Sequence, residues 1–410
     1  MSEKPVAIVL GGTNPHIKLV NNLKARGYFV VLVDFLPNPP AKSVADIHIM
    51  ESTLDKEKVL KVARICHASL VITTNIDQAN VTACYVAEKM DLPRPYSYET
   101  ALNVTEKHRM KKILAENGIL SSAFFTVSSI EEVKNVIFPV VVKPVDSNGS
   151  RGVHRCDNSD ELNQCLPIAL NVSREKKAIV EGFVDGEEIS FYYFIQNFKP
   201  YYITSNQRIK YKAKQNNVIQ SAGGYYPAPQ SRWVYERMES IATNIAKAFK
   251  LQNTPMFIQA IVQGEEVYVL EFAPRIGGGL SFRLIEQDNR FDIIDAAINS
   301  FLGEESQMNM IQPEYCSATM NVYAPGITVG GVTGVDQAIN EGVAKEFHQY
   351  KLKGSEVSPD MSSGSRIGCF FIQGKNIDEI KYNIHRVNEL VEVYDADGAS
   401  SMRHDIYQNL

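Results

Sequence analysis

The sequence predicts an α/β protein that begins with a doubly wound parallel sheet. Two apolar runs, VAIVL over residues 6–10 and YFVVLVD ending at Asp34, do not alternate with polar residues. Such runs are typical of strands that helices cover on both faces. Between them lies an amphipathic stretch that ends near Gly27, as a helix would. The order strand, helix, strand indicates a βαβ unit.

The same alternation continues as far as a proline-rich boundary. A helix around residues 56–66, a strand ending at Thr74 and a helix over 81–90 extend the sheet. The segment LPRP at 92–95 interrupts the pattern, so we place the first domain at residues 1–95. Its turn at Gly11 and Gly12 keeps only a fragment of a dinucleotide fingerprint. Both a plain turn and a contact with substrate or phosphate remain open for it.

Two further domains are expected after this boundary. A Lys-rich helix over 107–117, followed by short strands and helices to about Gln312, predicts a second domain at 96–312. Residues 313–410 begin again with the strands CSATMNVYA and RIGCFFI, and end with a helix over 377–391. This segment is expected to form a separate α+β domain.

The bulk composition excludes several classes of protein. With 410 residues, 44% of them hydrophobic and 22% charged, the chain is expected to be globular. Its net charge of -5 gives no electrostatic reason to bind nucleic acid. The six cysteines are scattered, and no run of about 18 apolar residues occurs. We therefore expect a cytoplasmic protein with free thiols and no membrane segment.

Three short motifs carry the chemistry. They are FPVVVKPVDSNGSRG ending at Gly152, VEGFVDGEEIS ending at Ser190, and EFAPRIGGG ending at Gly279. The first offers a lysine on a strand and then a loop of small residues whose N–H groups can approach an anion. Because the lysine precedes the glycines, this is not a Walker loop. The second offers two separated carboxylates, and the third an acid, an arginine and a glycine run. Together they suit a phosphate, a ribose and a metal ion.

In order and spacing these motifs resemble the ATP-grasp superfamily. The flanking segments resemble the end domains of ADP-forming carboxylate-amine ligases, in particular the bacterial L-amino-acid ligases and their carbamoyl-phosphate-synthase-like relatives. The resemblance implies a three-domain ATP-grasp fold, with a Rossmann-like N-terminal domain, an ATP-grasp core whose lid spans about 118–183, and an α+β C-terminal domain. It also implies ATP as cofactor, together with Mg²⁺ or Mn²⁺.

The resemblance assigns nucleotide-binding roles to individual residues. Lys107 and Lys143 correspond to the lysines that reach the ATP phosphates, and Glu181 to the acid beside the adenine amino group. Glu188 corresponds to the acceptor for the ribose hydroxyls, since one carboxylate can accept two of them. The flap over the phosphates corresponds to Ser147, Asn148, Gly149, Ser150 and Gly152, and the hinge against the base to Gly182, Phe183 and Val184. Lys111 and Lys112 are expected to be solvated charges of the same helix as Lys107.

The metal site departs from the pattern of the family. In a hairpin centred on Glu265, Gln259 lies opposite Glu271 on one face of the sheet. The family has acids at both positions and an Asn two residues after the second, where this chain has Ala273. A Gln oxygen can ligate Mg²⁺ but brings no charge. We predict one Mg²⁺ held mainly by Glu271, and a second that is weakened or completed by substrate.

The glycine-rich end of the third motif is expected to hold the reacting acyl group. Backbone amides beside a helix start attract anions, and Arg275 can bind a carboxylate or an acyl phosphate through two N–H groups. Arg275, Lys143 and Gly278 are therefore the predicted catalytic residues. For Arg283 a surface charge is equally open. The segment over 208–229, with a Gly-Gly turn, is open between a substrate-lining loop and an exposed hairpin.

The expected function is an ATP-dependent ligase that phosphorylates a carboxylate, for example of an amino acid, and couples it to an amine. Positioning and charge neutralisation suffice for phosphoryl transfer, so no side-chain nucleophile is required. The expected partners are a small carboxylate and a small amine, with a second copy of the chain as a candidate homodimer partner. Two alternatives remain: a carboxylase-type enzyme of the same superfamily, and a nucleotide-binding protein whose metal site has decayed.

Overall fold

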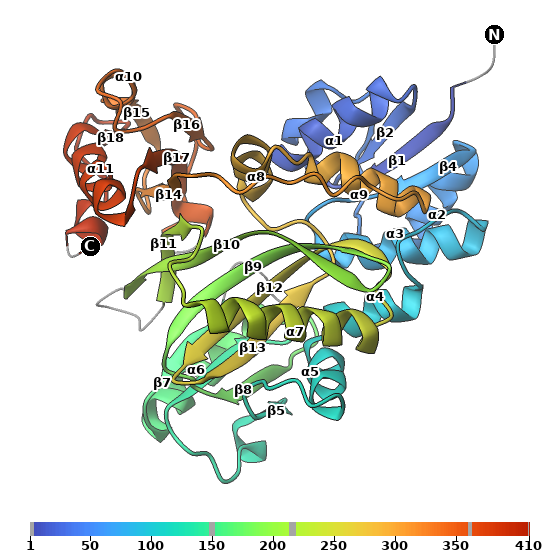
Figure 1. Ribbon diagram of the computed structural model, residues 1–410, viewed down its shortest axis with the longest axis horizontal. Coiled ribbons are helices and arrows are strands. Elements are labelled where there is room, and N and C mark those ends of the chain that lie inside the picture. Colours follow the sequence, from blue (N-terminus) through green and yellow to red (C-terminus); the bar gives the residue numbers. More distant parts are fainter. Residues whose placement is uncertain (1–3, 147–151, 213–218, 360–362, 409) are drawn as a thin grey trace.

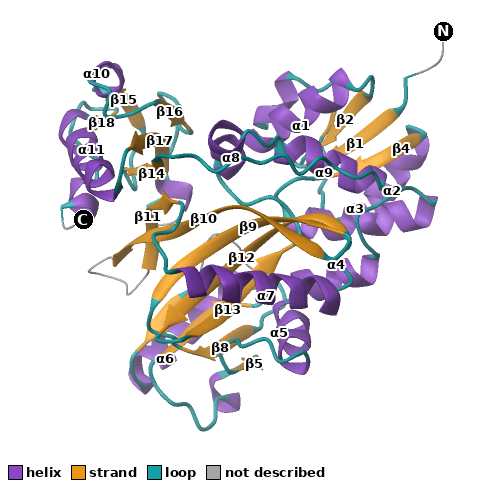
Figure 2. Cartoon of the chain, viewed as in Figure 1, coloured by secondary structure: helices purple, strands orange, loops and turns teal. Residues whose placement is uncertain are grey.

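The computed structural model describes residues 4–146, 152–212, 219–359, 363–408 and 410 of the chain. Figure 1 shows a parallel sheet with its helices at the N-terminal end, a long twisted antiparallel sheet across the middle, and a C-terminal αβ segment beyond it. The same division into layers is visible in Figure 2. The molecule is thus an α/β arrangement of one parallel and several antiparallel sheets, as the sequence predicts.

The N-terminal sheet has four parallel strands in the order β3-β2-β1-β4. Its elements are β1 (Val6–Leu10), α1 (Asn14–Ala25), β2 (Phe29–Val33), η1 (Pro40–Ser43), β3 (Ile47–Ile49), α2 (Lys56–Ile65), β4 (Ala68–Ile72) and α3 (Asp77–Met90). The unalternating strands are buried, because helices pack on the sheet. The expected start of the last helix at residue 81 is wrong, since α3 begins at Asp77. Its first turn is polar and gives no apolar periodicity.

A smaller antiparallel sheet follows two linking helices. The strand order is β5-β8-β6-β7. The elements are α4 (Tyr98–Thr105), α5 (Lys107–Glu116), β5 (Phe124–Val127), η2 (Ile130–Glu132), β6 (Val140–Pro144), β7 (His154–Cys156), α6 (Ser159–Val172) and β8 (Ala178–Gly182). Pro144 is the last residue of β6 and pairs with Ala178. Residues 147–151, which contain most of the predicted flap, lie outside the described part of the chain.

The central sheet has eight strands in the order β13-β12-β9-β10-β11-β14-β17-β16, each antiparallel to its neighbours. Helix α7 covers one face of its first half (Figure 1). The elements of this half are β9 (Glu187–Gln196), β10 (Lys199–Lys212), β11 (Ile219–Tyr226), α7 (Arg232–Ala248), β12 (Asn253–Gln263), β13 (Glu266–Ala273), α8 (Ser281–Asn289) and α9 (Ile293–Leu302).

The sheet continues without a break into the C-terminal segment, because β11 pairs with β14. Gly223 lies at this junction, where an added Cβ would stand 1.8 Å from the Thr319 carbonyl oxygen. The expected Gly-Gly turn at 223–224 is therefore wrong: these glycines lie inside β11 and allow two strands to approach. The remaining elements are β14 (Cys316–Tyr323), β15 (Val329–Thr333), α10 (Val335–Asn340), β16 (Glu346–Gln349), η3 (Ser363–Ser365), β17 (Arg366–Gly374), α11 (Ile377–Leu390), β18 (Glu392–Asp395) and η4 (His404–Tyr407).

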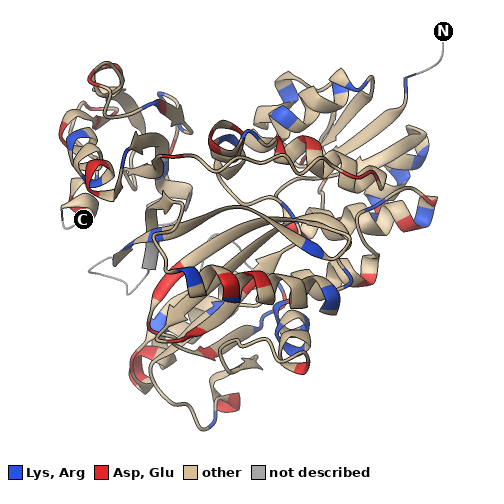
Figure 3. Ribbon diagram, in the orientation of Figure 1, with Lys and Arg blue, Asp and Glu red and all other residues tan. Residues whose placement is uncertain are grey.

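The surface helices carry charges of both signs. In the view of Figure 3, acidic and basic residues are interspersed along α7 and α11, as expected of helices with one face in solvent. Among the residues that the structure describes, no helix combines the length and apolar composition needed to cross a membrane.

Candidate active site

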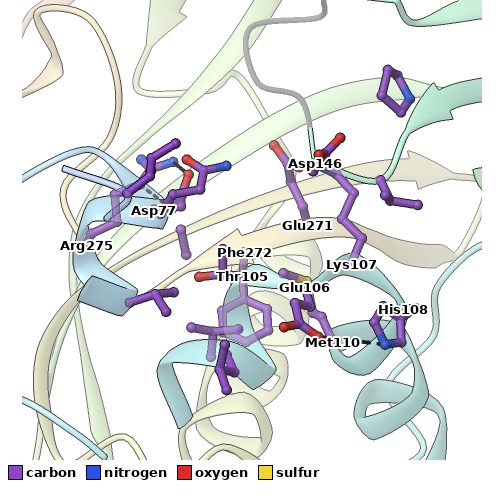
Figure 4. Close-up of a pocket in the computed structure, with 18 of the residues that line it drawn as sticks. Asp77, Thr105, Glu106, Lys107, His108, Met110, Asp146, Glu271, Phe272 and Arg275 are labelled. Atoms are coloured by element: carbon purple, nitrogen blue, oxygen red, sulfur yellow. Dashed lines mark hydrogen bonds and ion pairs between the residues drawn. The ribbon is translucent and has the colours of Figure 1, made fainter. Parts of the chain in front are cut away.

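A cavity of about 570 Å³ lies where the N-terminal unit, helix α5, the end of β6 and strand β13 meet. Five of the predicted site residues line it: Lys107, Lys143, Glu271, Arg275 and Gly278. Figure 4 shows Glu271, Asp146 and Lys107 toward one end and Arg275 with Asp77 toward the other. Residues that lie 171 positions apart in the sequence, from Lys107 to Gly278, are thus brought to one hollow.

Lys143 reaches this cavity while paired with Glu181, which lies beneath it on β8. The Lys143 Nζ atom is 2.6 Å from Glu181 Oε1, and the Lys111 Nζ atom is 3.0 Å from Oε2. Ser122 donates a further hydrogen bond of 3.1 Å to Oε2. Glu181 is only 5% exposed. Both of its oxygens are already bonded within the protein, so a contact with adenine stays a prediction.

Lys111 corrects the prediction that it is a solvated charge, because it is 1% exposed. Lys107 and Lys111 are four residues apart and therefore share one face of α5, which is turned toward the site. Lys112 points the other way, with a side chain that is 74% exposed, as expected. The spacing of four residues is the signal by which the sequence could have identified Lys111.

The charge balance of this buried cluster makes the stability of the protein depend on pH. Burial raises the pKa of Glu181, but the charges and hydrogen bonds of Lys143 and Lys111 more than offset this and lower it from 4.5 to about 2. A carboxyl whose folded pKa is depressed contributes stability above its unfolded pKa and loses it as pH falls through the folded pKa. We expect the free energy of unfolding to fall between about pH 4.5 and 2, in urea titrations, and to fall less in Glu181→Gln. An equal slope in both proteins would contradict the pairing.

The predicted metal ligands lie opposite each other on β12 and β13, as expected. The reason differs from the expected one. The turn holds only Gly264 and Glu265, so Gln263 pairs with Glu266, and this register alone would bring Gln259 opposite Leu270. A β-bulge between Gln259 and Ala260 shifts the register by one residue and places Gln259 opposite Glu271.

A basic group from β10, which β9 separates from β12 in the sheet, lies beside this pair. Arg208 on β10 forms an ion pair with Glu188 (Nη1 to Oε1, 2.7 Å), and Lys210 a second one (Nζ to Oε2, 3.3 Å). The hydrogen-bond network sets the orientation of the Gln259 amide. Its nitrogen donates to Glu271 Oε1 at 2.5 Å, and its oxygen accepts from Arg208 Nη2 at 3.1 Å. Burial raises the pKa of Glu188, but Arg208 and Lys210 hold it below its usual range.

These contacts limit how many metal ions the site can hold. Glu271 lines the cavity and can share a cation with phosphate oxygens. The oxygen of Gln259, however, faces a guanidinium rather than open space. The described residues contain no group of three or more His, Cys, Asp or Glu side chains suited to a metal. The residues present therefore fit one cation beside Glu271, and do not fit a second.

Arg275 is held by an acid that the sequence did not single out. Its Nε and Nη2 atoms donate to the two oxygens of Asp77 at 2.7 and 2.9 Å, and Nη1 donates to the Ile276 carbonyl at 2.7 Å. A guanidinium has five N–H groups, so two remain for a ligand. Burial raises the pKa of Asp77, and Arg275 lowers it below the usual range. Asp77 at the start of α3 thus fixes Arg275 from the N-terminal unit.

The remaining predicted residues are those of the flap and the hinge, and only some of them belong to the described part of the chain. Ser147, Asn148, Gly149 and Ser150 are not described. Gly152 has a φ of +72°, and an added Cβ would stand 2.9 Å from Pro144 Cγ, so only glycine suits it. At the hinge, Gly182 and Phe183 donate their N–H groups to Ala123 and Pro139 carbonyls. Val184 follows them, and its contact with a base stays a prediction.

Two open positions are also placed by the structure. Arg283 is a half-exposed partner of Glu346, with an Nη2 to Oε2 distance of 2.9 Å. The segment 208–229 contains paired residues of β10 and β11, and residues 213–218 between these strands are not described. Its basic residues Arg208 and Lys210 form ion pairs with Glu188.

Comparison with known proteins agrees with this geometry. The family described as "ATP-grasp domain" matches residues 136–283, which include Lys143, Glu181, Glu188, Glu271 and Arg275. The central part of the chain therefore carries an ATP-grasp domain. The match spans β6 to the start of α8, and the fold of the whole chain is also shared, as the comparisons below show.

The relatives of this chain are distant in sequence. It is 23% identical over 265 residues to an L-arginine-specific L-amino acid ligase of Bacillus subtilis, a match that covers 62% of this chain and 62% of that protein. It is 24% identical over 397 residues to a formate-dependent phosphoribosylglycinamide formyltransferase of Burkholderia thailandensis, covering 92% and 93%. The structure of an L-amino acid ligase from Bacillus licheniformis has a TM-score of 0.81 at 18% identity, covering 96% of this chain and 100% of that one. The fold is therefore that of ATP-grasp enzymes, while the substrates differ among these relatives.

Proposed function

We propose that this ATP-grasp chain is an ADP-forming ligase that converts a carboxylate into an acyl phosphate and couples it to an amine. The observation that carries the proposal is the cavity in which Lys107 and Lys143 meet Glu271 and Arg275. Two lysines suit the phosphates of ATP, and an arginine with two free N–H groups suits an anionic acyl group. The distant likeness to L-amino acid ligases supports an amino-acid-like acid.

Each residue then has a defined task. Lys107 and Lys143 bind the β- and γ-phosphates, and the amide groups around Gly278 together with Arg275 orient the carboxylate. Glu271 would hold Mg²⁺, which neutralises charge on the phosphates. The Asp77 carboxylate keeps Arg275 in place, so the substrate approaches a fixed guanidinium. Phosphoryl transfer requires mainly such positioning.

The reaction proceeds in two steps. A carboxylate oxygen bonds to the γ-phosphorus as the bond to the β-γ bridging oxygen breaks, which gives an acyl phosphate and ADP. The amine nitrogen then bonds to the acyl carbon as phosphate leaves, and the nitrogen loses a proton to water. The cavity supplies charge stabilisation for both steps, and the described part of the chain needs no covalent nucleophile for either.

A product assay tests the proposal. The protein is incubated with ATP, Mg²⁺ and pooled carboxylates and amines, and ADP, AMP and phosphate are measured. We expect ADP and phosphate in equal amounts, and only when both an acid and an amine are present. Release of AMP would contradict the ligase. Turnover with bicarbonate in place of the acid pool would instead support a carboxylase. ATP binding without turnover in any pool would support a regulatory nucleotide-binding protein, the alternative that Gln259 and Ala273 favour.

A further inference from the structure

Arg208 lies on the same sheet as Glu271, three strands away. Strands β13, β12, β9 and β10 are consecutive in the central sheet, so Glu271, Gln259, Glu188 and Arg208 come from four neighbouring strands. Gln259 links the row, because it donates to Glu271 and accepts from Arg208. Gln259 is 6% exposed, which leaves it little freedom to turn. The guanidinium is therefore separated from Glu271 by one side-chain amide.

The charges of this row are balanced within the protein. Glu188 and Glu271 carry two negative charges, and Arg208 and Lys210 carry two positive ones. A divalent cation bound at Gln259 would face the guanidinium at the same carbonyl oxygen. Like charges at such a separation repel strongly in a partly buried site. An acid at position 259 would supply a negative charge to offset this repulsion, and Gln259 does not.

Arg208 does not itself line the cavity, but its guanidinium is fixed beside Gln259, the residue that donates to Glu271 of the cavity wall. Its Nη1 atom is held by Glu188 and its Nη2 atom by Gln259, and the side chain is still 34% exposed. A guanidinium has five N–H groups and matches phosphate oxygens in pairs. Because the arginine lies on a strand and is held at two points, little conformational freedom is lost when a ligand binds.

We propose that Arg208 takes the place of a second divalent cation and contacts the terminal phosphate of ATP directly. This inference rests on the proposed nucleotide site. The chain then requires one Mg²⁺ at Glu271, and the guanidinium supplies the remaining positive charge. Gln259 is the residue that makes the exchange possible, since it accepts a hydrogen bond from Arg208 where a carboxylate would attract a metal ion.

Metal counting tests the proposal without relying on turnover. The full chain is mixed with adenylyl imidodiphosphate and Mn²⁺, and free Mn²⁺ is measured by electron paramagnetic resonance. We expect one Mn²⁺ per bound nucleotide in the wild type and two in Gln259→Glu. Two in the wild type would overturn the inference and leave the ligase intact. Failure of the wild type to bind the nucleotide at all would overturn both.

Variants of Arg208 provide the second arm. Loss of a charge-assisted hydrogen bond predicts that Arg208→Gln binds adenylyl imidodiphosphate on the order of 10- to 100-fold more weakly at low Mg²⁺. High Mg²⁺ should restore part of this affinity, a recovery that a merely structural role would not give. Arg208→Lys keeps the charge and should lie between the two, which also serves if Arg208→Gln does not fold. Arg232→Gln, at an exposed position on α7, is the matched control and should bind normally. Unchanged affinity in Arg208→Gln, or a loss that Mg²⁺ does not relieve, would overturn the inference.

Discussion

Replacing Glu181 by glutamine is expected to lower the free energy of unfolding by about 3–5 kcal/mol, the usual cost of removing one partner from a buried ion pair. The substitution keeps size and shape but leaves Lys111 and Lys143 without a negative charge. Lys111 is only 1% exposed, so its ammonium group is screened little by solvent. Burial already lowers its pKa, although Glu181 opposes this.

A matched substitution on the surface separates this effect from the loss of any carboxylate. Glu116 lies at the end of α5, with its Oε1 atom 3.9 Å from Lys112 Nζ and a side chain that is 59% exposed. Exposed pairs of this kind contribute only about 0–1 kcal/mol. Urea unfolding of the wild type, Glu181→Gln and Glu116→Gln should therefore show a large loss in the first variant alone. Equal losses in the two variants would show that Glu181 does not compensate the lysines.

The buried cluster of Lys111, Lys143 and Glu181 also shows how much of the site could be predicted from the sequence. Lys107 and Lys143 could be selected because each belongs to a motif. Lys111 could have been selected as well, since it follows Lys107 by one helical turn on the same face. The number of lysines in the segment favoured a helix whose charges lie in solvent, and this expectation was wrong for Lys111. Burial of a charge depends on its partner, and Glu181 is 70 residues away in the sequence.

Other features required the three-dimensional structure. The Asp77 carboxylate meets Arg275 only because α3 begins earlier than its apolar pattern indicates, and nothing local links the two residues. The opposition of Gln259 and Glu271 was predicted, but the bulge that produces it leaves no mark in the sequence. Gly223 was expected in a turn because glycines favour turns, whereas a crowded contact between β11 and β14 is the reason for it. Local pattern thus predicted the elements, and long-range contacts decided the details of the site.

The second large effect is expected at Glu271. Glu271→Gln should lower kcat by at least about 100-fold, as is typical when a preorganised charge at a phosphoryl-transfer site is lost. It is the one predicted ligand whose carboxylate lines the cavity, and Gln259 cannot replace its charge. The reciprocal change, Gln259→Glu, should leave kcat unchanged within a few fold and raise the affinity for Mg²⁺, because it adds a negative charge beside Glu271.

The two substitutions exchange the same chemical groups across one pair of strands, so they differ only in which position carries the charge. Steady-state release of ADP, with the substrates found in the pooled assay, gives kcat for each variant, and Mn²⁺ titration gives metal affinity independently of turnover. If the asymmetry holds, position 271 carries the cation and position 259 serves the Arg208 contact. If Gln259→Glu instead abolishes turnover while Glu271→Gln does not, the cation lies on the opposite strand. Because Gln259 donates to Glu271 and accepts from Arg208, that result would also require the amide to release both partners when nucleotide binds.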